Sequence, residues 1–402
     1  MNIRNQKLTR AGLVAAAIAA AFAVVPAAHA QKVVKLGVIM PMSGPNAAFG
    51  NTSLNGIKLA VEEFNAKGGV KSLGGAKIEL VVADIPQPNA AAAATQRLIS
   101  QERVSGVIGS FVSSVTIAAS EVTERAGVPL ITFAFADEIT GRGYKNVFQV
   151  SPKGSVVGRA QFDYALGLSK QAGEPVKKVA ILYEDTAYGT AQAKGLREGA
   201  KAAGIEVVVD EAYPLGITDA TPLVNKVRAS GAQMVFPVSY LNDSLLIIRT
   251  MRQQNITTPT IGGAAGYIIP DFKKGLGQYA ENVLSISTAS YDTAPAIGER
   301  YKAKYGAFMP HDALIFGAAT EAMMQAVDQA KSDDPAKVRD ALAKIKYCDG
   351  IAKGIPAGCV QFDQTGAAVG AKPVMVQWRG NDLVTVYPAE LAKGKAIWGG
   401  AR

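Results

Sequence analysis

The stretch from Val33 to Gly69 decides the fold and reads VVKLGVIMPMSGPNAAFGNTSLNGIKLAVEEFNAKGG. Its first part, Val33–Met40, is a short apolar run of the kind that forms a buried strand. In Leu54–Lys67 apolar residues recur every three or four positions, as on one face of a helix, and a Gly-Gly pair ends the pattern. Another strand is expected at Lys77–Ala83. This succession predicts a parallel sheet with crossover helices.

The alternation of strands and helices continues in two blocks. The first block holds further strands at Val104–Ile108 and Pro129–Phe133 and helices at Ala90–Glu102 and Val115–Ala126. The second block, roughly Ser151–Glu281, holds strands at Lys178–Tyr183, Glu206–Tyr213, Gln233–Pro237 and Pro259–Gly262 and helices at Ala187–Ala203, Pro222–Ser230 and Leu241–Gln254. We therefore expect two α/β lobes with parallel sheets, because 402 residues also exceed one ordinary core.

Helices without intervening strands follow the second block, at Ala294–Tyr305, Ala313–Lys331 and Pro335–Ile345. We expect them to cover the sheet of the first lobe, which would make both lobes discontinuous in sequence. The tail has hairpin character, with strands at Cys359–Phe362, Pro373–Trp378 and Leu383–Tyr387. Several segments would then cross between the lobes, and such a hinge suits ligand capture by closure.

The N-terminus has the features of a cleavable export signal. Arg4, Lys7 and Arg10 precede an apolar run that is short for a membrane span, and Ala28-His29-Ala30 has the form of a cleavage site. We expect residues 1–30 to be a signal peptide that is cleaved after Ala30, so that a periplasmic product begins at Gln31. No cysteine near the cut could carry a lipid anchor.

The composition argues against nucleic-acid binding and against catalysis. Without the signal peptide the chain has 39 basic and 33 acidic residues, and the basic ones are scattered rather than clustered. His311 is then the only histidine, which is poor material for a hydrolase triad or a zinc site, and a structural or capping role is expected for it. The glycine pairs at 68–69 and 262–263 lack a phosphate-binding pattern. We expect no enzyme activity, metal or cofactor.

Two cysteines, Cys348 and Cys359, are flanked by glycines and a proline. In an oxidising compartment this spacing indicates a disulfide that closes a small loop. The alternative, a reactive pair, would require a Cys-x-x-Cys spacing that is absent here.

Several motifs together carry a resemblance to a known family. They are Lys35–Pro45 (KLGVIMPMSGP), Asn55-Gly56 with Ala60–Asn65, Lys67–Val70, Val107–Ser110, Tyr183–Asp185 with Tyr188-Gly189, and Val360–Asp363. In this combination the chain resembles the periplasmic leucine/isoleucine/valine-binding proteins over essentially its whole mature length. The resemblance implies the type I periplasmic binding fold, with two lobes, three hinge crossings and a ligand cleft.

The resemblance also implies domain limits and partners. The N-terminal lobe would comprise residues 31–150 and 283–364, and the C-terminal lobe residues 151–282 and 365–402. The function would be that of a monomeric solute-binding subunit that delivers a small-molecule ligand to an ABC permease in the inner membrane. A ligand sensor for a membrane receptor is an alternative that this fold permits.

Carboxylate binding is expected at the start of the helix after the Val107–Ser110 motif. Relatives place a serine there, which matches Ser113 with Ser114 beside it. Hydroxyls and free N–H groups at a helix N-terminus form an anion site, although serine also favours such positions as a plain cap. Relatives then present Ala-Thr after the next strand; Ala134 matches, but Phe135 replaces the threonine.

Aromatic residues of the second lobe are expected to close over the ligand. Tyr188, in a Tyr-Gly step that opens a helix, matches the tyrosine of relatives, and Tyr240 occupies the place of a second aromatic residue. A tyrosine ring can pack on an apolar ligand while its hydroxyl reaches a polar group.

One departure from the family concerns the ligand's ammonium group. Relatives that bind amino acids pair it with a glutamate, whereas the matching segment, Gly262–Tyr267, contains no acid. An unpaired buried ammonium would cost several kcal/mol. Either Asp185 or Asp243 takes over this role, and the ligand is a branched-chain or hydrophobic amino acid, or the ligand is an amine-free acid or short amide and Tyr267 lines the pocket.

Overall fold

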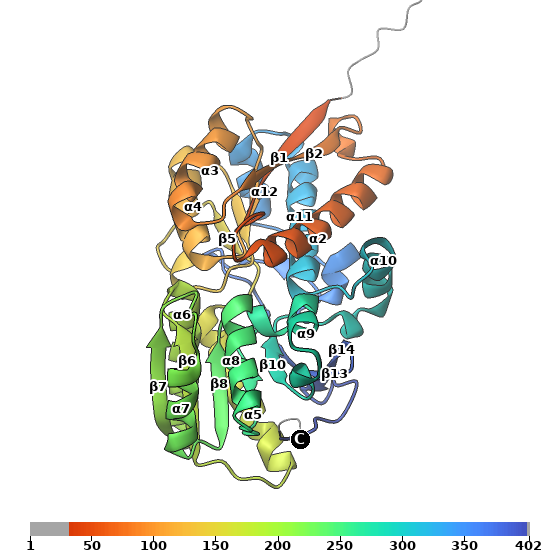
Figure 1. The fold of residues 1–402 in the computed structure, drawn as a ribbon. Coiled ribbons are helices and arrows are strands. Elements are labelled where there is room, and N and C mark those ends of the chain that lie inside the picture. Colours follow the sequence, from red (N-terminus) through yellow and green to blue (C-terminus); the bar gives the residue numbers. More distant parts are fainter. Residues whose placement is uncertain (1–31, 400–402) are drawn as a thin grey trace, which may run out of the picture. The chain divides into compact units, whose positions relative to one another are not determined.

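The computed structural model describes residues 32–399, in which Figure 1 shows an upper and a lower α/β lobe. The predicted signal peptide and its cleavage site lie outside the described residues. The first lobe contains a parallel sheet in the order β2-β1-β3-β4-β5. Its strands are β1 (Val33–Met40), β2 (Lys77–Asp84), β3 (Val107–Gly109), β4 (Leu130–Thr132) and β5 (Val147–Gln149). The apolar run of β1 is buried because this strand lies between two others.

Helices from two distant parts of the sequence cover this sheet. They are α2 (Ala47–Ala66), α3 (Ala91–Ser100) and α4 (Ser113–Ala126), with α10 (Pro295–Tyr305), α11 (His311–Ala330) and α12 (Pro335–Leu342). The buried helix α11 packs along α2 and reaches β3 and β4, which confirms that the late helices cover the first sheet. A Cβ atom at Gly56 would lie 2.0 Å from the backbone oxygen of Ala313, so only glycine allows α2 and α11 to approach this closely.

The second lobe contains a sheet that is parallel only in part. Its parallel strands are β6 (Lys178–Glu184), β7 (Glu206–Tyr213), β8 (Met234–Val238), β9 (Ile261–Gly262) and β10 (Leu284–Ser287). A parallel bridge between Val235 and Thr260 joins β8 to the segment before β9. The tail adds β13 (Val374–Arg379) and β14 (Asp382–Tyr387) as an antiparallel hairpin on β10. The predicted hairpin is confirmed, and it makes this edge of the sheet antiparallel.

The chain passes between the lobes after β5, after β10 and after the short strand β12 (Val360–Gln361), as the type I periplasmic binding fold requires.

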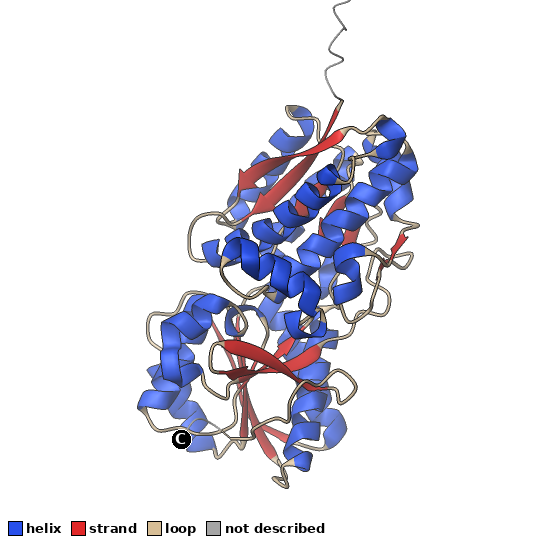
Figure 2. Cartoon of the chain, turned by 90° about the vertical axis from the view of Figure 1, so that its right-hand side faces the viewer, coloured by secondary structure: helices blue, strands red, loops and turns tan. Residues whose placement is uncertain are grey.

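The second lobe's helices are α5 (Gly154–Gln171), α6 (Ala187–Ala203), α7 (Thr221–Ser230), α8 (Leu241–Gln253) and α9 (Pro270–Leu276). Figure 2 shows the strands of both lobes flanked by helices. The residue limits given above for the two lobes stay a prediction.

Sequence reasoning misplaced some element ends. Helix α2 begins at Ala47 rather than Leu54, because Phe49 is also buried and extends its apolar face. The tail segment expected at Cys359–Phe362 forms only the two-residue strand β12, which pairs with β11 (Lys346–Tyr347). Cys348 and Cys359 are joined by a disulfide that closes the loop between these strands.

Among the described helices, none is long and apolar enough to span a bilayer.

Candidate ligand-binding site

A small cavity lies between the two lobes, and we call it the inner cavity. The space between its walls is about 210 Å³, open solvent included. It is lined by Phe111, Ser113, Phe133, Ala134, Phe135, Tyr188, Tyr240 and Ala265. These residues follow the carboxyl ends of β3 and β4 in the first lobe and of β6, β8 and β9 in the second. Ligands of parallel α/β sheets bind at such edges, because the loops after the strands converge there.

Aromatic rings from both lobes surround the inner cavity. Within the first lobe the ring centroids of Phe133 and Phe135 are 5.1 Å apart, and within the second those of Tyr188 and Tyr240 are 5.1 Å apart. Across the cleft Phe135 and Tyr188 are 5.9 Å apart. Phe49 stacks on Phe111 at 4.4 Å and meets Tyr240 edge-on at 6.0 Å. The lobes therefore meet through apolar ring surfaces that suit a hydrophobic ligand.

Ser113 is the first residue of α4 and is almost fully buried. Its Oγ accepts a hydrogen bond from the backbone N–H of Ala136 at 3.2 Å, so its own proton can be donated to another acceptor. The residue before the helix, Val112, has no side chain that can cap it. Free N–H groups and the positive end of the helix dipole therefore lie beside the inner cavity, and both favour an anion.

Tyr240 reaches this helix N-terminus from the other lobe. Burial, with the Glu184 carboxylate nearby, raises the pKa of the Tyr240 hydroxyl well above its usual value, while a hydrogen bond from the Ser113 N–H opposes the rise. The phenol oxygen thus occupies the place where an anionic ligand group would bind. The two lobes are in contact in this structure, which explains the small volume of the cavity.

Tyr188 is positioned at the first turn of α6 by an internal carboxylate. Glu184, at the end of β6, accepts N–H groups of Thr186 at 2.8 Å and Gly189 at 2.6 Å. Burial raises the pKa of Glu184 above its usual range, and these hydrogen bonds oppose the rise. The buried Tyr188 hydroxyl donates to the backbone oxygen of Gly263, which ties α6 to the loop after β9.

The segment after β9 supplies one wall of the inner cavity through Ala265. Ala264 and Ala265 have positive φ angles of 68° and 30°, which are uncommon for residues other than glycine. This geometry turns Ala265 toward the inner cavity. Tyr267 lies behind the wall instead, with its hydroxyl 2.8 Å from Ser239 Oγ and its ring fully buried. Such backbone strain is typical of functional sites.

A second depression, which we call the edge pocket, adjoins the inner cavity. Its lining includes Pro45, Pro86 and Ser114 of the first lobe and Thr186, Tyr240 and Asp243 of the second. Tyr240 borders both spaces and so separates them. The carboxylate of Asp243, on α8, is buried here.

The structure brings most of the sequence-predicted residues together. Ser113, Ala134, Phe135, Tyr188 and Tyr240 line the inner cavity, and Ser114 lines the edge pocket. Tyr267 does not line the inner cavity, because the turn at Ala264 directs its ring into the core. Asp185 lies on the exposed surface, because it follows the strand end on the side opposite to Glu184. Phe111 was missed, although its place just before Ser113, after β3, could have indicated it.

His311 lies in the interior at the first position of α11. Its Nδ1 is 3.2 Å from Thr288 Oγ1, and its ring centroid is 4.9 Å from that of Phe133. Burial lowers the pKa of His311 to about 3, so the ring is neutral at physiological pH. Within residues 32–399 no group of His, Cys, Asp and Glu side chains is arranged to hold a metal ion.

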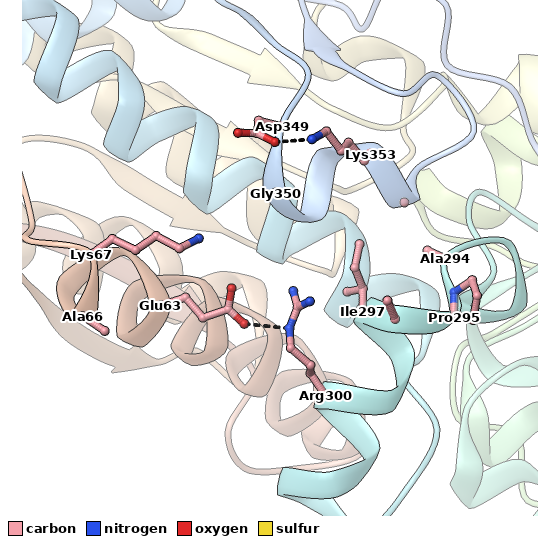
Figure 3. A pocket seen from close by; sticks show the side chains of 12 residues that line it. Glu63, Ala66, Lys67, Ala294, Pro295, Ile297, Arg300, Asp349, Gly350 and Lys353 are labelled. Carbon is pink, nitrogen blue, oxygen red and sulfur yellow. Dashed lines mark hydrogen bonds and ion pairs between the residues drawn. The ribbon is translucent and has the colours of Figure 1, made fainter.

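A larger depression, which we call the outer pocket, lies on the first lobe alone (Figure 3). It is formed by α2, α10 and the disulfide loop. Glu63 pairs with Arg300 at 3.0 Å, and Asp349 pairs with Lys353. These charges largely satisfy one another, and no lining residue follows the strands β3, β4, β6, β8 or β9 that border the inner cavity.

Comparisons with known proteins agree with this geometry. A family model described as periplasmic binding protein matches residues 33–382. The Leu/Ile/Val-binding protein homolog 7 of Brucella suis is 35% identical over 393 residues, which cover 94% of this chain and 96% of the relative. The Leu/Ile/Val-binding protein homolog 8 of Brucella melitensis is 33% identical, and the match covers 90% of this chain and 92% of the relative.

Solved structures extend the comparison. The branched-chain amino acid transporter substrate-binding protein LivJ of Streptococcus pneumoniae, in complex with isoleucine, matches with a TM-score of 0.76 and 28% identity, over 88% of this chain and 100% of that one. A solute-binding protein of R. palustris in complex with benzoate shares the fold, with a TM-score of 0.78 and 21% identity over 92% and 98% of the chains. The chain therefore belongs to the periplasmic binding proteins of the Leu/Ile/Val-binding type.

Proposed function

We propose that this protein is the periplasmic solute-binding subunit of an ABC importer and captures a small carboxylate-bearing ligand with a hydrophobic body by hinge closure. The observation that carries the proposal is the inner cavity, where aromatic rings of both lobes surround Ser113 at the uncapped start of α4. An aromatic enclosure with one anion site at its wall fits such a ligand.

The binding steps follow from the contacts between the lobes. In the open form the ligand carboxylate would accept hydrogen bonds from the Ser113 hydroxyl and from the N–H groups of α4 that face Tyr240 in this structure. Tyr188 and Tyr240 would then close over the hydrophobic part. Because a ligand shifts such an equilibrium only through its preference for one state, the closed form must make contacts with it that the open form lacks. The closed form would dock on the permease.

Two ligand classes are supported by different observations. The names of the relatives and the isoleucine bound to LivJ support a branched-chain or other hydrophobic amino acid. The walls of the inner cavity support an amine-free acid, because they include no carboxylate that could pair with an ammonium group. Burying that group without a partner would cost several kcal/mol.

A thermal-unfolding screen of unfolded and refolded protein tests the proposal, since refolding removes ligand carried over from expression. The panel contains leucine, isoleucine, valine, phenylalanine, their deaminated acids, short amides and benzoate. A ligand at about 100 times its Kd adds about 2.7 kcal/mol to the free energy of unfolding and raises the midpoint by a few degrees. Stabilisation by at least one hydrophobic carboxylate is expected. Stabilisation only by solutes without a carboxylate, such as sugars, would contradict the proposal.

A further inference from the structure

An unpaired carboxylate in the edge pocket suggests where a ligand's positive charge could be bound. Asp243 is only 1% exposed. Its Oδ2 accepts the backbone N–H of Gly216 at 3.1 Å, and the N–H of Ile217 also faces the carboxylate, whereas Oδ1 has no hydrogen-bond partner among the described residues. No ion pair between Asp243 and a described Lys, Arg or His side chain is formed. Asp243 lies in the first turn of α8, where the helix dipole favours an anion. A positively charged ligand group beside the unpaired Oδ1 would stabilise the buried carboxylate further.

The position of Asp243 relative to the carboxylate site matters equally. Asp243 and Ser114 line the same pocket, while Ser113, the preceding residue, lines the inner cavity. The N-terminus of α4 therefore separates an aromatic space from a space that holds an unpaired acid. An α-amino acid has this distribution of groups, because its carboxylate, ammonium group and side chain all branch from one carbon atom.

We propose that Asp243 binds the ammonium group of a hydrophobic α-amino acid whose carboxylate lies at the start of α4 and whose side chain enters the inner cavity. This inference rests on the proposed function and chooses between its two ligand classes. Asp243 would then supply the acid that the family resemblance predicts and that Gly262–Tyr267 lacks. Tyr240 separates the two spaces and accepts a hydrogen bond from the Ser113 N–H. Its oxygen would have to leave this N–H, so that the ligand carboxylate could accept the hydrogen bond instead.

A purely structural role for Asp243 predicts a different outcome. Through Gly216 and Ile217 its carboxylate holds the loop after β7, so its loss would lower stability and weaken every ligand alike. Burial raises the pKa of Asp243, and a bound ammonium group would oppose that rise. The two roles are distinguished by a comparison of ligands that differ only in the amine.

The experiment is calorimetric titration of refolded protein with leucine and with its deaminated acid. The wild type should prefer leucine, and D243N should weaken leucine binding by about 30-fold or more while the deaminated acid changes by less than about threefold. Asparagine retains an oxygen that can accept the Gly216 N–H. D185N, which alters an exposed acid after β6 that lines neither pocket, is the control and should leave both affinities unchanged. Should D243N not fold, the wild-type preference and a crystal structure with leucine, showing its nitrogen at Asp243 Oδ1, provide the same test.

The possible failures are distinguishable. Equal weakening of both ligands in D243N, or a wild type that binds the deaminated acid as tightly as leucine, overturns the role of Asp243 and leaves the proposed function intact. A wild type that binds only solutes without a carboxylate overturns both.

Discussion

The inner cavity and the outer pocket differ in how their polar groups are satisfied. The outer pocket is much larger, at about 1300 Å³ including open solvent against about 210 Å³, but its charges are paired with one another (Figure 3). The inner cavity contains no charged pair, yet it borders an uncapped helix N-terminus and lies at the strand ends of two lobes. Unmet hydrogen-bonding capacity, more than volume, therefore identifies the candidate site.

The comparison predicts that the two regions can be perturbed separately. Changes around the outer pocket should alter the stability of the first lobe and leave ligand affinity unchanged. Changes in the inner cavity should alter affinity with smaller effects on stability. The following predictions run from the largest expected free-energy change to the smallest.

Loss of the disulfide should have the largest effect on stability. Cys348 and Cys359 are 11 residues apart, and their bond restricts the unfolded chain, so the double substitution to serine should lower the free energy of unfolding by roughly 3 kcal/mol. Denaturant unfolding measures this change, and reduction of the wild type, which has no other cysteine, serves as a second route to it. Ligand affinity should change by less than about twofold. A large loss of affinity in the folded variant would show that the two regions are coupled.

Substitution of Ser113 should have the largest effect on binding among the changes in the inner cavity. Ser113→Ala removes a buried hydroxyl that can donate to a ligand carboxylate, and hydrogen bonds to charged groups contribute about 1.5–3 kcal/mol, or about 10- to 100-fold in Kd. Titration with the tightest ligand of the screen measures the loss. Ser120→Ala is the control, because Ser120 is a buried serine of the same helix that lines neither pocket, and it should change Kd by less than about threefold. Equal losses in both variants would place the carboxylate elsewhere.

The fold was predictable from the sequence because its signals are local. Most strands and helices follow from apolar periodicity within one segment, whereas β5, β10, α5 and α9 were not predicted. The motif residues Ser113 and Tyr188 follow directly from strand ends. The antiparallel edge made by β13 and β14 could be predicted as a hairpin, but its partner β10 is distant in sequence.

The remaining parts of the site depend on contacts that no local pattern contains. Whether Ala265 or Tyr267 faces the cavity depends on positive φ angles at two alanines, which sequence propensity disfavours. Phe49 approaches Tyr240 only because α2 meets the other lobe. Asp185 and Asp243 were equivalent candidates in the sequence, and burial separates them.

Glu321 should make stability depend on pH through the region behind the outer pocket. Its buried carboxylate accepts the Ile351 N–H at 2.7 Å, and burial raises its pKa from 4.5 to about 7. The folded state therefore binds this proton more tightly than the unfolded state, and stability is lost as the pH rises from about 4.5 through about 7.

The measurement is the difference in unfolding free energy between Glu321→Gln and the wild type across this pH range. The variant should lack the decline that Glu321 causes, and ligand affinity should be the same for both proteins at each pH. Parallel stability curves for the two proteins would contradict the assigned pKa. A pH-dependent difference in affinity would contradict the separation of the two regions.

Tyr188→Phe should give the smallest effect and tests the second lobe's part in the inner cavity. The ring remains, but the Gly263 carbonyl loses its buried donor, which should lower the free energy of unfolding by about 1 kcal/mol. Because this contact holds α6 against the loop that carries Ala265, its loss should also weaken ligand binding, by about three- to tenfold. Tyr183→Phe, which removes a hydroxyl from a half-buried ring outside the cavity, should leave Kd unchanged. A Tyr188→Phe variant that is destabilised but binds normally would mean that the second lobe contributes ring surface alone, so that the first lobe's Ser113 and α4 carry the polar part of recognition.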